Sequence, residues 1–302
     1  MRFHHLDLNL LVALDTLIRE QNITRAAERM HISQSAASGL LARLRDYFDD
    51  ELLVAVGRRM MPTPLAQELA EPVRRVLLEI QSSIVNRPAF DPATCSRHFK
   101  IIASDFVTTV FLAPLTQRLQ QLAPHITLDI LPTGNQYNEL LNQGEVDFVI
   151  MPDHFLSDDH PKELLFEDQY NCVLWRDNPL VGDDLSLEQY LQLGHVAVSL
   201  GNDRAPSFEE EYARRFGKER RVELTTSNFN TLPHLLIGTH RVAIMQARLS
   251  SLYAQYLPLK ILAMPVSLPP LTEFIQWNRF LDNDPAHRWM REVFHEVAGI
   301  PQ

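Results

Sequence analysis

The first 86 residues carry apolar side chains at the spacing of α-helices. A leucine-rich stripe starts after Asp7, which is placed to cap the first helix, and extends to Ile18. Two shorter helices should follow, one capped by Thr24 and one by Ser33, with a tight joint at residues 31–32. The third helix is expected to bury the face made of Ala37, Leu40, Leu41, Leu44 and Phe48. The pattern predicts a compact three-helix unit.

The opposite face of the third helix is polar and begins with short side chains. It carries Gln34, Ser35, Ser38, Ala42 and Arg45. Short polar side chains let a helix approach the major groove closely, and Gln34 can form two hydrogen bonds to an adenine edge. A helix N-terminus also favours phosphate. Because a bundle without any ligand has a polar face too, periodicity alone leaves a DNA-reading helix and a structural corner both open.

Residues 52–63 predict a short hairpin with a basic turn. The turn is Gly57-Arg58-Arg59. Two arginines at a hairpin tip suit a wing that touches DNA, and they equally suit a solvated basic turn.

A long helix is expected directly after the hairpin. Thr63 can cap it and Pro64 suits its first position. Its narrow apolar stripe, which reaches Asn86, predicts pairing with a second copy of the helix. The stripe consists of Leu65, Leu69, Val73, Val76, Leu77, Ile80 and Ile84. Pro72 inside the helix predicts a bend but not a break.

From residue 98 onward, strand patterns alternate with helical patterns. Strands are expected at 98–104, 126–131, 146–151, 170–175, 195–200, 221–226, 241–246, 259–266 and 272–278, and helices at 110–123, 136–143, 208–216 and 285–297. Apolar strands separated by helices are typical of parallel α/β units. We therefore expect two α/β subdomains linked by crossovers near residues 160–162 and 264–265.

Polar and aromatic residues follow several of these strands. Ligands of open α/β sheets bind at the carboxyl ends of strands, where Ser104 could offer its hydroxyl to an anionic or phenolic group or could simply cap a helix. The candidate effector-binding residues are Ser104, Phe106, Thr108, Phe111, Thr133, Asn135, Phe155, Gln169, Ser199, Phe229 and Gln276. Phenylalanines beside hydroxyl and amide groups suit an aromatic effector with polar substituents, although each residue alone also suits a core or a loop.

Composition describes an ordinary globular protein with an uneven charge. The chain has 302 residues, is 45% hydrophobic and 22% charged, and is long enough for two or three cores. Of its formal charge of -10, residues 1–86 contribute a net of -1 and the remainder -9. The acidity therefore belongs to the C-terminal part. The N-terminal part uses arginine without any lysine, which favours forked contacts to phosphate or base edges.

Several functional classes lack the sequence features that they require. No apolar run approaches the length of a membrane span. Asp7, Asn9 and Asp15 interrupt the N-terminal apolar segment, so no signal peptide is expected and the protein is expected in the cytosol. The sequence contains no nucleophile elbow, phosphate loop, dinucleotide fingerprint or zinc-ligand spacing, so neither an enzyme nor a metal or cofactor site is expected. Cys95 and Cys172 are far apart, which disfavours but leaves open a redox pair.

The segment "ITRAAERMHISQSAASGLLARLRDYF", the hairpin and the long helix resemble LysR-type transcriptional regulators. The opening "MRFHHLDLNLLVALDTL" and "VGRRMMPTPLAQELAEPVR" are most similar to the NodD and NahR branch. The chain departs from the family pattern at Ser35, where the family usually has proline, and in Leu52-Leu53-Val54-Ala55, where the wing pattern usually ends in arginine. The wing arginine must then come later in this chain.

The resemblance implies an α+β fold with three parts and a named set of DNA contacts. Residues 1–63 would form a winged helix-turn-helix, 64–87 a dimerising linker helix, and 88–302 an effector-binding domain resembling periplasmic binding proteins. Its subdomain I would comprise 88–161 and 265–302, and its subdomain II 162–264. The residues expected at DNA are Thr24, Arg25, Ser33, Gln34, Ser35, Ser38, Arg43, Arg58 and Arg59.

The resemblance also implies partners. These are double-stranded promoter DNA, a second copy of the chain or a tetramer, RNA polymerase as a further candidate, and a small-molecule co-inducer of the flavonoid or aromatic-acid class. A redox-sensing regulator and an effector-independent one remain as alternatives.

Overall fold

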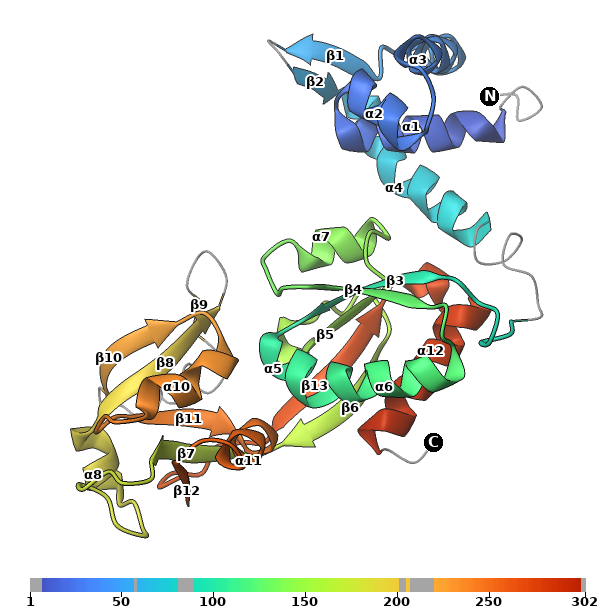
Figure 1. Cartoon of the computed structure of the whole chain (residues 1–302). Coiled ribbons are helices and arrows are strands. Elements are labelled where there is room, and N and C mark those ends of the chain that lie inside the picture. Colours follow the sequence, from blue (N-terminus) through green and yellow to red (C-terminus); the bar gives the residue numbers. More distant parts are fainter. Residues whose placement is uncertain (1–6, 57–58, 81–89, 201–204, 207–219, 300–302) are drawn as a thin grey trace. The chain divides into compact units, whose positions relative to one another are not determined.

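The structure, a computed structural model, describes residues 7–56, 59–80, 90–200, 205–206 and 220–299 (Figure 1). The chain divides near residue 88 into two compact units. None of the helices within these ranges is long and apolar enough to cross a bilayer. The helix expected at 208–216 and the last residues of the predicted linker helix lie outside the described residues.

The first unit has the predicted order of helices and hairpin. Its elements are α1 (Leu8–Glu20), α2 (Ile23–Arg29), α3 (Gln34–Phe48), β1 (Leu53–Val56), β2 (Arg59–Pro62) and α4 (Pro64–Ile80). The caps at Asp7 and Ser33 are confirmed, since their side chains accept from Asn9 N at 3.0 Å and Ala36 N at 3.2 Å. The cap predicted at Thr24 is wrong. Asn22 accepts from Arg25 N at 3.1 Å instead, so α2 starts earlier and Thr24 lies inside it.

The core of this unit is the one that helical periodicity predicts. Leu10, Leu14 and Leu17 of α1 meet Leu41 and Leu44 of α3. The remaining members of the predicted α3 face behave as expected, with Ala37 buried and Leu40 and Phe48 packed at the edge. Burying such side chains is worth roughly 1.5–3 kcal/mol each.

A strained turn ties the hairpin to the helices. Leu52 is fully buried with φ 57°, a left-handed conformation that is rare for a bulky residue. Asp50 holds it, because its carboxylate accepts from Leu52 N and from Thr63 Oγ1, both at 2.6 Å. Thr63 Oγ1 in turn accepts from Ala66 N at 3.2 Å and caps α4, as predicted. One aspartate thus connects the turn, the hairpin and the next helix.

The apolar stripe of α4 is divided between two roles. The helix runs through Pro72 without a break, as predicted. Val73 packs in the core of the unit and Leu69 at its edge. Part of the stripe therefore packs within its own unit, although the whole stripe was expected to pair with a second copy of the helix. Val76, however, is 39% exposed. The periodicity could not show this division because it does not say which turn of α4 meets α1.

The second unit contains two mixed sheets. The first has the order β4-β3-β5-β13-β6, with β3 (His98–Ala103), β4 (Thr127–Leu131), β5 (Phe148–Pro152), β6 (Lys162–Asp168) and β13 (Leu271–Trp277). β3 pairs in parallel with β4 and β5, whereas β13 runs antiparallel to β5 and β6. The second sheet has the order β10-β8-β11-β7-β12, with β7 (Tyr170–Trp175), β8 (Gly194–Leu200), β10 (Arg221–Thr226), β11 (Val242–Gln246) and β12 (Leu259–Ala263); β9 (Ala205–Pro206) pairs with β8.

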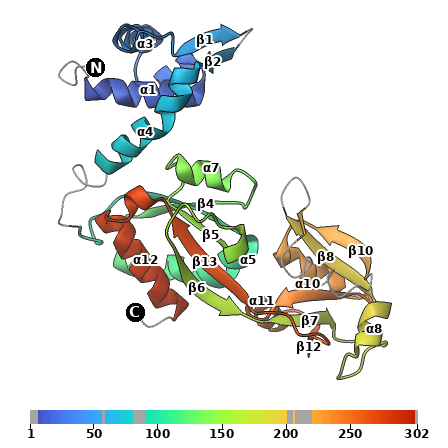
Figure 2. The same ribbon diagram turned by 180° about the vertical axis from the view of Figure 1, so that it is seen from behind.

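Helices cover both faces of the first sheet (Figures 1 and 2). They are α5 (Asp105–Val107), which continues through the π-helix η3 (Thr108–Leu112) into α6 (Ala113–Leu122), then α7 (Tyr137–Asn142) and α12 (Pro285–Ala298). Alternating residues of β3 separate the faces. Ile101 packs with the α6 and α12 side, whereas Ile102 packs with Leu141 of α7. The second sheet is accompanied by α8 (Leu187–Gln192), α10 (Leu232–Leu236) and α11 (Ala247–Ala254).

The first crossover between the sheets lies later than expected. It was expected at residues 160–162, but β6 still pairs with β13 in the first sheet, and the chain enters the second sheet only after Gln169. The segment "KELLFED" of β6 was not predicted as a strand. A strand at the edge of a sheet, with several exposed side chains, lacks the continuous apolar run that marks a central one. The chain returns to the first sheet between β12 and β13.

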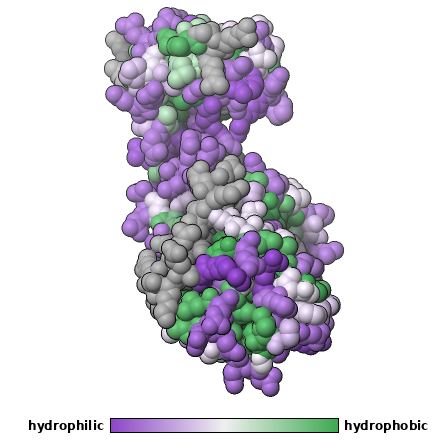
Figure 3. Space-filling view, turned by 90° about the vertical axis from the view of Figure 1, so that its left-hand side faces the viewer, coloured by the Kyte–Doolittle hydropathy of each residue, from purple (hydrophilic) through white to green (hydrophobic). Residues whose placement is uncertain are grey.

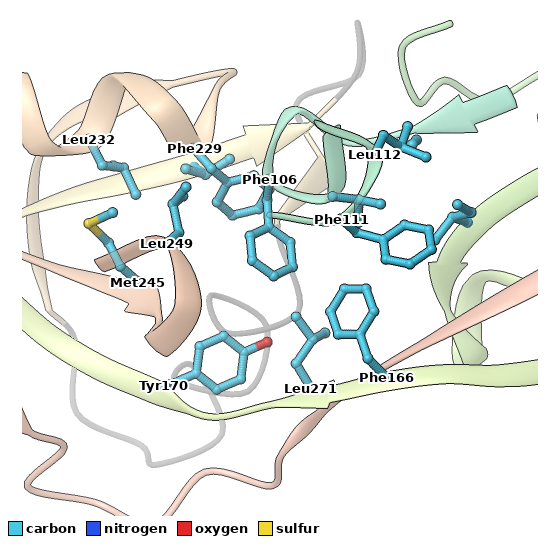
Figure 4. Packing of buried hydrophobic residues seen from close by; sticks show 14 of the residues in the cluster. Phe106, Phe111, Leu112, Phe166, Tyr170, Phe229, Leu232, Met245, Leu249 and Leu271 are labelled. Carbon is cyan, nitrogen blue, oxygen red and sulfur yellow. The ribbon is translucent and has the colours of Figure 1, made fainter. Parts of the chain in front are cut away.

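An aromatic cluster connects the two sheets of this unit (Figure 4). The ring of Phe106 lies 6.2 Å from that of Phe166 in β6 and 6.3 Å from that of Phe229, which opens the short helix η5 (Phe229–Thr231) beside the second sheet. Phe111 lies 5.8 Å from Phe166. The two subdomains therefore share one continuous hydrophobic core.

A buried histidine in the second sheet predicts a pH-dependent stability. His195 of β8 is fully buried with Nε2 2.8 Å from Tyr190 O, and burial, reinforced by Arg220, lowers its pKa to about 4. In the unfolded chain the pKa of a histidine lies near 6.5, so the neutral His195 contributes fully to the unfolding free energy above that pH. This contribution, on the order of 3 kcal/mol, is lost as the pH falls toward 4. We expect His195→Gln to reduce the slope of unfolding free energy against pH in this window, measured by urea titration. The exposed control His125→Gln should leave the slope unchanged, and an equal slope for both variants would contradict the assignment.

Candidate functional site

The start of α3 presents a short polar edge to solvent. Gln34 and Ser35 are exposed and Ser38 is half-buried. Ser33 and Ser35 place their hydroxyl oxygens 3.0 Å apart, while Ser33 caps the helix. These side chains leave the N-terminal turn of α3 accessible, as entry into a major groove requires.

The arginines near this edge already have partners within the unit. Arg25 Nη2 donates to Glu20 O at 2.6 Å, and Arg29 Nη1 donates to Glu20 Oε1 at 2.9 Å. Arg43 Nη2 lies 3.1 Å from Asp7 Oδ2. The hydrogen bond from the amide of residue 9, followed by that from Arg43, lowers the pKa of Asp7. These ion pairs are exposed, so a phosphate can compete for the arginines at little cost.

Arg45 was expected on the polar face of α3, but its side chain turns away from that face. Its Nε donates to Glu51 O and its Nη2 to Leu53 O, both at 2.8 Å, and it pairs with the Glu51 carboxylate at 2.9 Å. This arginine joins α3 to β1 and therefore stabilises the wing base. Helical periodicity placed it on the outer face because a long side chain can turn back toward a neighbouring strand.

The expected wing contacts cannot be placed. Arg58 lies outside the described residues, and Arg59 is described only through its backbone in β2. The hairpin exposes apolar side chains, with Val56 60% and Met61 40% exposed. Figure 3 shows that a small hydrophobic area reaches the otherwise mainly hydrophilic surface of this unit.

The second unit contains a cavity of about 820 Å³ between its two subdomains. It opens at the carboxyl ends of β3, β4 and β10, as expected for an α/β sheet. Its lining consists of Ile102, Ala103, Ser104, Asp105, Leu131, Pro132, Thr133, Gly134, Asn135, Gln136, Tyr137, Leu140, Ser227 and Asn228. Three of the predicted effector residues, Ser104, Thr133 and Asn135, therefore meet at one site. The volume suits a ligand of the size of a drug molecule.

The chemistry of the cavity is polar and lacks basic groups. Hydroxyl and amide side chains dominate its polar surface, and the lining, as far as it is described, contains one carboxylate, Asp105, and no Lys, Arg or His. Burial raises the pKa of Tyr137, whose hydroxyl donates to Phe155 O, so this phenol stays protonated. Ser104 accepts from Val107 N at 3.2 Å and caps the helix, which leaves its hydroxyl proton available to a ligand.

The predicted phenylalanines Phe106, Phe111 and Phe229 do not line this cavity. They are at most 5% exposed and form the aromatic cluster instead. Gln276 does not line the cavity either, because it is fully buried and its Nε2 donates to Ser157 O at 2.6 Å. Residues that follow a strand end, namely Ser104, Thr133 and Asn135, thus lie at the cavity, whereas the phenylalanines of the short helices fill the core.

The other four candidates are also placed away from the lining. Thr108 donates through its hydroxyl to Ser104 O at 2.9 Å. Phe155 packs with the α7 side of the first sheet. Gln169 is exposed at the crossover, and Ser199 pairs with β9.

Ser227 and Asn228, which the second subdomain contributes to the lining, were not among the predicted residues, although the neighbouring Phe229 was. Ser227 and Asn228 follow β10, and Asn228 caps η5 by accepting from Thr231 N at 3.0 Å. A polar cap directly after a strand is the signal that identified Ser104, so the same rule could have found Asn228. Asp105 and Tyr137 also line the cavity, but neither directly follows a strand, so this rule does not identify them.

Comparison with known proteins covers both units. A family model described as "Bacterial regulatory helix-turn-helix protein, lysR family" matches residues 8–67, and one described as "LysR substrate binding domain" matches residues 94–299. Nodulation protein D 2 from Rhizobium tropici is 44% identical over 300 residues, covering 99% of this chain and 95% of that protein. A probable transcriptional regulator from Pseudomonas aeruginosa of known structure is 29% identical with a TM-score of 0.66, covering 96% of this chain and 98% of that one. CbnR in complex with its target DNA, 15% identical with a TM-score of 0.53 over 97% of this chain and all of that one, shares the fold.

Proposed function

The chain belongs to the LysR family of transcriptional regulators, and from this premise we propose that a neutral, hydroxylated aromatic molecule bound in the cavity controls its action on promoter DNA. It is a DNA-binding regulator and not an enzyme. The observation that carries the proposal is the lining of the cavity, which combines hydroxyl and amide groups with one carboxylate and, among the residues described, no basic side chain.

The charge of the lining distinguishes between the two effector classes that the sequence left open. An aromatic acid would bring a carboxylate beside Asp105, and a buried charge without a partner is costly. A flavonoid-like phenol has no charge to desolvate. Its hydroxyl groups can pair with Ser104, Thr133 and Asn135, while its rings lie against Leu131 and Leu140. The cavity therefore supports the flavonoid class over the aromatic acids.

We expect a hydroxylated flavone such as apigenin to raise the melting temperature of the full-length chain, because a ligand of the folded state stabilises it by mass action. Salicylate at the same concentration should not. Ser104→Ala should weaken flavone binding by roughly 5- to 10-fold, the value of one net hydrogen bond.

The loss of a helix cap in that variant needs a control. Ser186→Ala removes the cap of α8, which accepts from Gln189 N at 3.2 Å away from the cavity. Both variants should lose about 1 kcal/mol of stability. Equal flavone affinities for the two variants would reduce Ser104 to a cap, and a response to salicylate alone would reverse the assigned effector class.

At DNA, Thr24, Arg25, Ser33, Gln34, Ser35, Ser38 and Arg43 are the proposed contacts, with Arg58 and Arg59 at the wing. Gln34 and Ser38 would face bases, and arginines released from Glu20 and Asp7 would position the helix on phosphates. Occupancy of the cavity would change the relative placement of DNA-bound subunits and so the bend or spacing of the DNA.

A homodimer through α4 is the proposed assembly, with a tetramer and contact to RNA polymerase as further steps. The exposed Val76 and the half-buried Leu65 and Ile80 of the predicted stripe support it. They form the part of the stripe that the core of the first unit does not fully cover.

A redox mechanism is less well supported than an effector. Burial raises the pKa of Cys172 to about 12, so its thiol stays protonated, and only the thiolate is reactive. Cys172 Sγ lies 3.3 Å from Met264 Sδ, and Cys95 is free as well.

A further inference from the structure

A polar network joins the two subdomains directly beside the cavity. The carboxylate of Asp105, at the start of α5, accepts from Phe229 N at 3.2 Å and from Asn230 N at 2.8 Å. α5 belongs to the first subdomain, and η5 follows β10 of the second. Hydrogen bonds from backbone N–H groups to an ionised carboxylate are stronger than those between neutral groups.

The Asn230 side chain adds a second set of bonds across the same junction. Its Nδ2 donates to Asp105 O at 3.1 Å and to Thr109 Oγ1 at 2.9 Å. Tyr253 of α11 donates its hydroxyl to Asn230 Oδ1 at 3.1 Å. Burial, together with the charge of Asp105, raises the pKa of Tyr253, which keeps this phenol a donor.

The network adjoins the cavity but is not identical with its lining. Asp105 lines the cavity, as does Asn228, which caps η5, whereas Asn230, Thr109 and Tyr253 do not. Thr109 lies in the π-helix η3, where the wider turn interrupts the regular spacing of side chains. Residues outside the lining can therefore be changed without removing a ligand contact.

We propose that Asp105, Asn230, Thr109 and Tyr253 form a latch that holds the two subdomains in the arrangement that shapes the cavity, and that this latch sets the affinity for the effector. That the latch sets the affinity for the effector rests on the proposed function, whereas its role in positioning the two subdomains does not. Asp105 and Asn230 are positioning residues, and no step of effector chemistry is assigned to them.

The link between the latch and the effector affinity follows from the fraction of molecules in the latched arrangement. If only the latched arrangement binds the effector well, the apparent dissociation constant is the intrinsic one divided by the latched fraction. Removing bonds that exist only in the latched arrangement lowers that fraction. A variant with an intact cavity lining should then bind the effector more weakly.

The role of the latch in positioning the two subdomains is tested on the full-length chain without any effector. Spin labels on cysteines introduced at the exposed Glu139 of α7 and Glu188 of α8, in a Cys95→Ser background, report the distance between subdomains by pulsed electron paramagnetic resonance. In samples diluted with excess unlabelled chain, which suppresses distances between subunits of the proposed dimer, we expect one narrow distance for the parent chain and a broadened or shifted distribution for Asn230→Ala and Thr109→Val. Thr108→Val is the matched control, because the Thr108 hydroxyl bonds only Ser104 O within its own subdomain among the contacts described. Unchanged distributions in both latch variants would overturn the latch.

The effect of the latch on effector affinity is tested with the same proteins and apigenin. We expect Asn230→Ala to raise the apparent dissociation constant about 5- to 10-fold, a typical coupling between sites, and Thr108→Val to leave it unchanged. If the parent chain binds apigenin and Asn230→Ala binds it equally well, the coupling is overturned even where the distances change. If the parent chain binds no flavone, the proposed effector class fails, and the distance measurement still decides the latch.

Discussion

Replacing Gln34 by alanine is expected to lower the sequence discrimination of this regulator. Gln34 is exposed in the first turn of α3, and a glutamine bonded in two places to an adenine contributes about 1–3 kcal/mol of discrimination, or roughly 5- to 150-fold. The measurement is the ratio of affinities for a duplex selected from random DNA and for its scrambled version, by gel shift. Gln121→Ala, on α6 of the other unit, is the matched control and should keep the ratio. A Gln34→Ala protein with the parental ratio would remove α3 from the reading role.

Arg43→Ala should give a different signature from Gln34→Ala. A phosphate contact carries no sequence information, so its loss should weaken binding to both duplexes alike and reduce the salt slope by about 1. Because Arg43 is paired with Asp7 in the free chain, part of its gain on DNA offsets that exposed pair. A change in discrimination without a change in salt slope would instead assign Arg43 to a base.

The second large effect is expected at the ion pair that attaches α4 to α1. Arg74 Nε donates to Asp15 Oδ1 at 2.7 Å, with a second bond from Nη2, and both side chains are nearly buried, at 10% and 12% exposed. Arg19 lies 3.6 Å from the same carboxylate, and burial followed by the charge of Arg74 lowers its pKa to about 10. Asp15→Ala leaves these arginines without their carboxylate. We expect a loss of about 3 kcal/mol in unfolding free energy, measured by urea titration of the full-length chain.

Two companion variants separate the ion pair from a general effect of charge. Glu28→Ala, at an exposed position of α2, should change stability by less than about 0.5 kcal/mol. The double variant Asp15→Ala/Arg74→Met should recover much of the loss, since the stranded charge at residue 74 is gone. If Asp15→Ala is as stable as Glu28→Ala, the pair does not hold α4 to the unit.

Local patterns were enough to predict the candidate DNA-binding elements. Caps, the proline at the start of α4 and apolar spacing involve residues within a few positions of each other, which is why α1, α3 and the hairpin were found. The same information could not decide where Arg45 would turn, because its partners Glu51 and Leu53 lie in a separate strand. For the cavity, strand ends were a correct guide to Ser104 and Thr133 but not to the direction of the neighbouring phenylalanines.

The sequence by itself determined the order of the elements, the two-part organisation of charge and the position of the polar edge at Gln34. Each of these depends on composition or on periodicity along a single segment. The tertiary structure alone decided that Arg74 meets Asp15, that Phe106 fills a core instead of a cleft, and that Asp105 reaches the amides of η5. These contacts join residues far apart in the chain, so they depend on which faces of separate elements meet, and periodicity within one element carries no information about that choice.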